Sequence, residues 1–185
     1  VNILFQMKFE LGKKRYNDYP TFFKTLFEER VQKLSIDGGF TCPNRDGSKG
    51  VGGCSFCNNE SFNPDYCRAV RGITEQIDEG IRFFARKYKG QRYLAYFQAY
   101  SNTYAPLDVL KLRYEEALAH PMISGLVIGT RPDVVSEEVL DYLEELARRY
   151  YVCVEYGVES VNDTVLRQVN RGHDFAVAEQ AIRAT

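Results

Sequence analysis

The sequence has little or nothing of three features that would each indicate a class of protein. Its 24 Lys and Arg almost balance 25 Asp and Glu, and the net charge of −1 gives no broad attraction to DNA or anionic lipid. It has no apolar run near the roughly 18 residues of a membrane span. It also has no signal peptide with a basic start and a small-residue cleavage site. We therefore expect a cytoplasmic protein with no membrane partner.

What the sequence does have is enough apolar material for one domain. Of the 185 residues 44% are hydrophobic, an ordinary share for a soluble protein with a sizeable core. Residues 1–6 precede Met7 and end in ILFQ, which is typical of a tag or linker remnant, so we leave them out of the fold. Residues 7–185 are interpreted as a single domain.

Helical and strand-like segments alternate along this domain. The apolar pattern predicts strands at residues 31–37, 93–99, 125–129 and 151–157, and helices from Pro20 and over 74–89, 108–118, 136–150, 162–169 and 175–185. Thr74, Asp108 and Ser136 are interpreted as helix N-caps. Strands separated by helices favour a parallel sheet with right-handed crossovers, so the fold class is α/β. Four strands cannot close an eight-stranded barrel, and the last helix has no stop signal, so we expect the domain to be incomplete at its C-terminus.

Three of the five cysteines lie close together in a glycine-rich loop after the first predicted strand. Cys42, Cys54 and Cys57 have the spacing C-x11-C-x2-C. Two thiolates separated by two residues can bind one metal centre, and the glycines let the backbone wrap around a bulky group. Iron–sulfur clusters are generally held by four thiolates, so three would leave one iron open. The alternative is a structural zinc site closed by Cys67, in a non-catalytic binding module.

An open iron is the distinguishing feature of the radical SAM superfamily, which this chain resembles well beyond its cysteines. The spacing of eleven is longer than the commonest one and is similar to that of a longer-loop group. That group includes the elongator catalytic subunit and a bacterial family of Fe-S oxidoreductases typified by YhcC. The resemblance to the latter rests on five blocks in the correct order: the residues at 38–47, YLAYFQAYSNTYA at 93–105, GTRPD at 129–133, EYGVES at 155–160 and NRGHD at 170–174.

The resemblance implies a partial (β/α) TIM-like barrel of the radical SAM type, cut off after about four strands. It also implies an oxidoreductase or transferase that binds S-adenosylmethionine (SAM) at a [4Fe-4S] cluster. An electron from a reductant such as flavodoxin or ferredoxin would pass through the cluster and split SAM to a 5′-deoxyadenosyl radical. The substrate cannot be read from these residues. Related enzymes act on tRNA, but the near-zero net charge gives a nucleic-acid partner no support.

Individual roles carry over by position. Cys42, Cys54 and Cys57 match the cluster ligands, and Phe56 matches the aromatic residue beside the adenine. Gln98, Tyr100 and Ser101 stand where the superfamily's glycine-rich motif meets the methionine amino group, although the glycines are absent.

The remaining cofactor contacts are implied for four charged residues. Glu159 and Arg171 match cofactor-binding positions, and the guanidinium of Arg171 suits the methionine carboxylate. Arg131 or Glu155 substitutes for a ribose-binding Glu, because Gly129 occupies that position.

Simpler interpretations stand beside these roles. The four charged residues could form a salt-bridge set at a barrel rim. Cys67 and Cys153 fit local packing, and Tyr93 and Tyr96 fit core packing better than a base-stacking platform. His173 is interpreted either as a switch or proton donor or as a helix-entry residue. A further hypothesis is that a chain of this length folds but is inert.

Overall fold

The computed structural model describes residues 15–16, 18–58, 61, 63–86 and 91–185, so the predicted linker remnant at 1–6 lies outside the described residues. Its centre is a four-stranded parallel sheet in the order β1-β2-β3-β4. The strands are β1 (Arg30–Ile36), β2 (Gln91–Phe97), β3 (Ile123–Thr130) and β4 (Tyr151–Tyr156). The predicted α/β class is confirmed, and the arrangement agrees with part of a radical SAM barrel.

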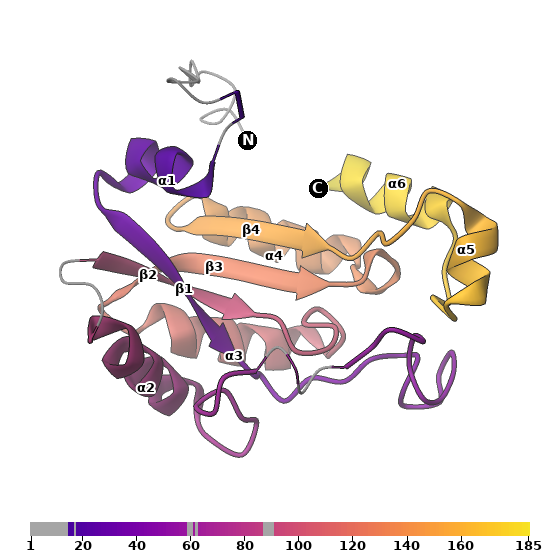
Figure 1. The fold of residues 1–185 in the computed structure, drawn as a ribbon, viewed down its shortest axis with the longest axis horizontal. Coiled ribbons are helices and arrows are strands. Elements are labelled where there is room, and N and C mark those ends of the chain that lie inside the picture. The colour runs from indigo at the N-terminus through magenta and orange to yellow at the C-terminus, as the bar shows by residue number, and fades with distance from the viewer. Residues whose placement is uncertain (1–14, 17, 59–60, 62, 87–90) are drawn as a thin grey trace.

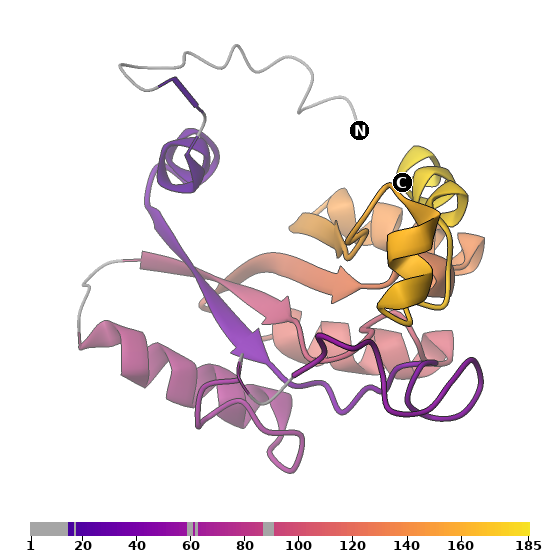
Figure 2. The same cartoon turned by 45° about the vertical axis from the view of Figure 1, so that its right-hand side comes forward.

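Helices cover the two faces of the sheet unequally. Three of them, α2 (Ile73–Ala85), α3 (Leu107–Leu118) and α4 (Glu137–Ala147), pack on what we call the helix face, and α1 (Tyr19–Phe27) lies on the other side, the open face (Figures 1 and 2). The short η3 (Pro132–Val134), α5 (Asp163–Gln168) and α6 (Phe175–Ala184) follow the ends of β3 and β4. Among the described residues no helix has the length and apolarity to cross a membrane.

The main core lies between the helix face and its three helices. Alternate strand residues such as Leu34, Phe97 and Leu126 point into it and are fully buried. They meet apolar positions of the helices, among them Ile77 and Leu110. This apolar layer fixes the sheet and therefore the positions of the loops that leave its carboxyl ends.

The open face carries polar side chains as well as a small apolar group. Phe23 of α1 packs on Leu94 and Val127 toward the amino-terminal ends of the strands. Nearer the carboxyl ends, Lys33 of β1 forms an ion pair with Glu155 of β4. Gln98 donates a hydrogen bond to Ser35 at 2.9 Å. This face becomes more polar toward the carboxyl edge, meaning the edge of the sheet where all four strands end.

Two of the three predicted N-caps are wrong. Gly72 caps α2 and Pro106 caps α3, so both helices begin before Thr74 and Asp108, which lie inside the first turn. Ser136 is confirmed, since its hydroxyl accepts the N–H of Val139 at 3.3 Å. The predicted end of the second helix near residue 89 lies outside the described residues.

The core-packing interpretation is confirmed for Tyr93 and holds in part for Tyr96, which packs on the small apolar group of the open face. Tyr93 is buried in the main core. Tyr96 lies on the open face, where it is only partly buried and Lys33 Nζ is 4.5 Å from its ring centroid. The difference arises because residues 93 and 96 are three apart, and an odd separation puts strand residues on opposite faces.

A candidate cofactor site at the carboxyl edge

The cysteine loop, residues 42–57, consists of turns rather than helix or strand. The carbonyl of Cys42 accepts the N–H groups of Arg45 at 2.8 Å and Asp46 at 3.1 Å, which closes a turn immediately after the first cysteine. The N–H of Cys57 donates to the carbonyl of Cys54 at 2.9 Å and closes a second turn. A further hydrogen bond, from the N–H of Gly53 to the carbonyl of Asn44 at 2.8 Å, joins the two parts of the loop.

Contacts from distant segments anchor this loop. Asn44, which is 1% exposed, donates its amide to the carbonyls of Asn170 at 2.6 Å and Arg171 at 3.1 Å. Asn170 returns a hydrogen bond from its side chain to the carbonyl of Gly53 at 2.9 Å. The N–H of Ser55 donates to Val169 at 3.0 Å. The cysteine loop is therefore fastened to the segment between α5 and α6.

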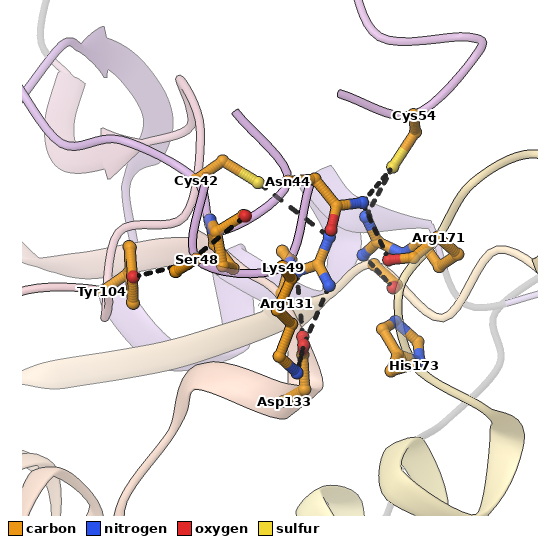
Figure 3. A network of polar contacts seen from close by, with 12 residues as sticks. Cys42, Asn44, Ser48, Lys49, Cys54, Tyr104, Arg131, Asp133, Arg171 and His173 are labelled. Carbon is orange, nitrogen blue, oxygen red and sulfur yellow. Dashed lines mark hydrogen bonds and ion pairs between the residues drawn. The ribbon is translucent and has the colours of Figure 1, made fainter. Parts of the chain in front are cut away.

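Two further contacts fasten the loop to the ends of β2 and β3. Ser48 and Tyr104 share a hydrogen bond of 3.0 Å, and Lys49 forms an ion pair with Asp133 (Figure 3). Segments that follow three different strands thus hold one loop, as expected where parallel strands end at a common edge.

A cavity of about 370 Å³ opens between this loop and the carboxyl edge. Ten of the eleven site residues predicted from the sequence line it: Cys42, Cys54, Phe56, Cys57, Gln98, Tyr100, Arg131, Glu155, Glu159 and Arg171. Ser101 is not among the lining residues. It is 1% exposed, and its N–H donates to the carbonyl of Thr41 at 3.1 Å. Ser101 therefore contacts the backbone directly before Cys42 rather than the cavity.

Two of the lining residues have unusual backbone conformations. Tyr100 and Glu159 have φ angles of 65° and 67°, in the left-handed region that side chains other than glycine enter at a cost. Such conformations persist only where surrounding contacts enforce them, and they are common at functional sites.

Each of the three cysteine sulfurs has a guanidinium group beside it. The distances to Sγ are 3.4 Å from Arg45 Nη2 to Cys57, 3.6 Å from Arg171 Nη1 to Cys54 and 3.9 Å from Arg131 Nη1 to Cys42. Asn44 Nδ2 is a second donor to Cys54, at 3.5 Å. Figure 3 shows Arg131 reaching Cys42, and Arg171 and Asn44 reaching Cys54.

The charges around the cavity are arranged to orient these donors. Arg131 is 3% exposed and binds Asp133 through Nε at 2.9 Å and Nη2 at 2.8 Å. Burial opposes ionisation of Asp133, but hydrogen bonds and charge from Arg131 and Lys49 outweigh it and lower the pKa of the carboxyl to about 2. The hydrogen bond and charge of Cys57 raise the pKa of Arg45. Asp133 therefore stays ionised and holds Arg131 in place.

The residues around the cavity fit a negatively charged group bound to the cysteines. Three guanidinium groups (Arg45, Arg131 and Arg171) and two carboxylates (Glu155 and Glu159) line the cavity. Asp133, which does not line the cavity, pairs with Arg131 and Lys49. The Nε atoms of Arg45 and Arg171 are buried and have no hydrogen-bond partner among the described residues. Leaving charged donors unpaired is costly, and an anion in the cavity would offset that cost.

The two candidates for the ribose contact already have partners. Arg131 is engaged by Asp133, and Glu155 by Lys33 across the open face. Both still line the cavity, and their role toward a ribose stays a prediction.

Several residues of this site were not singled out from the sequence. Asn44 and Arg45 lie in the same block as Cys42, but their function depends on folding of the cysteine loop. Asp133 was visible only as part of the GTRPD block. The signal that could have found Arg45 is its position three residues after Cys42, where a tight turn brings it back toward the cysteines.

The two other cysteines lie away from the cavity. Cys67 is 1% exposed, and burial raises the pKa of its thiol to about 12. Cys153 is half-buried on the open face beside Tyr151. Within the described residues no three His, Cys, Asp or Glu side chains are placed to hold a single metal ion. The three cysteines instead stand around the cavity wall, an arrangement that suits a cluster in which each thiolate binds its own iron.

Fold and site together define an α/β protein with a cysteine-lined cavity at the carboxyl edge of a parallel sheet. Comparison with known families gives this class a name. The family model described as the radical SAM superfamily matches residues 42–185, which is more than half of the chain. The chain belongs to the radical SAM superfamily.

Curated relatives come from bacteria and an archaeon. The chain is 46% identical over 151 residues to Protein YhcC of Escherichia coli strain K12, covering 81% of this chain and 48% of that protein. It is 38% identical over 163 residues to Uncharacterized protein YtqA of Bacillus subtilis strain 168, covering 88% and 51%. It is 33% identical over 172 residues to Uncharacterized protein MJ0486 of Methanocaldococcus jannaschii, covering 91% and 52%. The chain spans about half the length of these relatives, and no solved structure gave a significant match.

Proposed function

We propose that this chain holds a [4Fe-4S] cluster on Cys42, Cys54 and Cys57 and belongs to an enzyme that cleaves SAM reductively. The observation that carries the proposal is the convergence of three cysteines, each with its own guanidinium donor, on one cavity. Membership of the superfamily supports an enzyme of this class rather than a zinc-stabilised binding module.

In this proposal the chain's own residues bind and orient the two cofactors. The three thiolates hold three irons and leave the fourth open for SAM. Arg171 supplies a cation for the methionine carboxylate, with Glu159 beside it at 4.0 Å. Phe56, half exposed at the cavity, offers its ring to the adenine. Gln98 and Tyr100 line the cavity after β2 and would contact the methionine amino group.

When bound, the cluster supplies one electron, taken from a reductant such as flavodoxin or ferredoxin, which breaks a C–S bond of SAM to give methionine and a 5′-deoxyadenosyl radical. The surrounding residues keep the cluster in a defined place and hold cations close to its ligands.

Anaerobic reconstitution with iron and sulfide tests the proposal. The expected product is a brown protein with equal amounts of iron and acid-labile sulfide, and addition of SAM and dithionite should yield 5′-deoxyadenosine. Cys54→Ala should lose the cluster. Cys153→Ala is the matched control, because Cys153 is half-buried on β4 and does not line the cavity.

Two results would overturn the proposal. A Cys54→Ala variant that assembles the same cluster and cleaves SAM would show that the ligands are assigned wrongly. One bound zinc per chain, with neither iron nor sulfide after reconstitution, would favour the binding module. A cluster that forms while SAM stays intact would indicate that a chain of this length is folded but inert, and the same assay on a longer chain would then locate the missing part.

A further inference from the structure

The three arginines at the cavity come from three separate segments, and each lies beside a different cysteine. Arg45 belongs to the cysteine loop and faces Cys57, Arg131 follows β3 and faces Cys42, and Arg171 follows α5 and faces Cys54. Two of the arginines also pair with a carboxylate, Arg131 with Asp133 and Arg171 with Glu159. In addition, each of the three arginines directs one N–H toward a sulfur.

A second contact fixes the direction of each guanidinium group. Asp133 holds Arg131 through two of its nitrogens. The carbonyl of Gly157 accepts from Arg171 Nη2. Arg45 donates to the carbonyl of Cys57 at 3.3 Å and lies 5.8 Å from the ring centroid of Tyr100. The donors are therefore aimed at the sulfurs by the protein itself.

A glycine makes room for the most exposed of the three. Gly53 has a φ angle of 84°, and a Cβ atom there would lie 3.0 Å from Arg45 Nε. Glycine at this position allows both the left-handed turn and the close approach of the guanidinium group. The backbone of the cysteine loop is thus shaped around Arg45.

Hydrogen bonds and positive charge at cysteine sulfurs are among the factors that set the reduction potential of an iron–sulfur cluster. They stabilise the reduced form more than the oxidised form, because reduction adds a negative charge. We propose that Arg45, Arg131 and Arg171 are positioning residues that each donate to one cluster ligand and together raise the potential at which the cluster accepts its electron. This inference rests on the proposed function.

Arg45 provides the sharpest test, since it is only partly buried and lies in the cysteine loop rather than in the sheet. Arg45→Gln should shift the equilibrium between the oxidised and reduced forms of the reconstituted cluster at least tenfold toward the oxidised form. This shift corresponds to a reduction potential about 59 mV lower. Arg45→Lys keeps the charge and loses the planar fork, so we expect a smaller shift in the same direction. Arg92→Gln is the control, since Arg92 is half exposed at the start of β2.

The measurement is an anaerobic redox titration of the reconstituted chain, followed by the electron paramagnetic resonance signal of the reduced cluster, with iron and sulfide determined on the same samples. An unchanged potential in Arg45→Gln, at full iron and sulfide content, would overturn this inference and leave the proposed function standing. A parent chain that assembles no cluster would overturn both. If Arg45→Gln does not fold, the Arg45→Lys variant decides, because its potential must still fall below those of the parent and Arg92→Gln.

Discussion

The apolar layer under the helix face and the cysteine loop are stabilised by different kinds of contact. The apolar layer consists of fully buried side chains such as Leu126 and Ile77, and burial of nonpolar area stabilises it wherever the shapes fit. The cysteine loop depends on a few polar contacts with defined partners, such as Asn44 with Arg171 and Lys49 with Asp133. The apolar layer therefore tolerates many sequences, whereas the cysteine loop requires particular residues at particular positions.

The comparison predicts that damage to the two regions will have different consequences. A change in the apolar layer should lower the stability of the whole domain. A change in the loop contacts should open the site while leaving the sheet folded, because local opening can occur below the free energy of global unfolding. Four substitutions test this, in descending order of expected effect.

Leu126→Ala should have the largest effect on stability. Leu126 lies at the centre of the sheet with no exposed surface, and truncation of such a side chain costs about 2–5 kcal/mol. Urea unfolding followed by circular dichroism measures this loss in the free energy of unfolding. Leu112→Ala, at a position of α3 that is 64% exposed, should change the free energy of unfolding very little. Equal losses for the two would contradict the assigned core.

Asp133→Asn should come next, because it removes the common partner of Arg131 and Lys49. A carboxyl whose pKa falls from 3.8 to about 2 contributes about 2 kcal/mol of stability above the higher value. That contribution is lost as the pH falls from about 4 to about 2. Thermal unfolding over this range should show the parent and the Asn variant converging, and a constant gap between them would rule out the ion pair as the cause.

Asn44→Ala should open the cysteine loop at a cost of about 1–2 kcal/mol, since it leaves two carbonyls without their donor. Hydrogen exchange should speed up for the amides of the loop and of the segment after α5. The amides of β2 and β3 should keep their protection. Asn58→Ala, at an exposed position just beyond the loop, serves as the control. Uniformly faster exchange throughout the sheet would contradict the separation of the two regions.

Ser136→Ala should have the smallest effect of the four, about 1 kcal/mol, through loss of the N-cap of α4. Thr74→Ala should cost less, because Thr74 is exposed inside α2 and donates only a weak hydrogen bond to Glu116 at 3.3 Å. Thermal unfolding compares the two. A greater loss for Thr74→Ala would indicate that the N-terminus of α2 depends on the contact with Glu116.

The sequence analysis anticipated the sheet better than the details around it. Alternating apolar residues identify strands because the period of two is local, and the bounds of all four strands lie within two residues of those predicted. The caps of α2 and α3 were misplaced because Gly72 and Pro106, which offer no side-chain oxygen, begin those helices. The position of α1 on the open face depends on packing across the sheet and has no local signal.

The sequence analysis predicted most of the residues that line the cavity but not the contacts between them. Family resemblance selected ten residues that the fold gathers around one cavity. It could not select Asn44, whose acceptors lie 126 and 127 residues further along the chain, or the pairing of each sulfur with one arginine. Such pairs are set by the relative placement of loops after different strands, and a single sequence does not encode that placement in any local pattern.

The position of α1 has a consequence for the cavity, although the helix does not line it. Phe23 packs on Leu94 and Val127, so α1 covers apolar groups of the open face that would otherwise meet water. Lys33 lies between two aromatic rings, with its Nζ 5.2 Å from the ring centroid of Tyr19 in α1 and 4.5 Å from that of Tyr96 in β2. Because Tyr96 also lines the cavity, a displacement of α1 would be transmitted to the cavity wall through these two contacts.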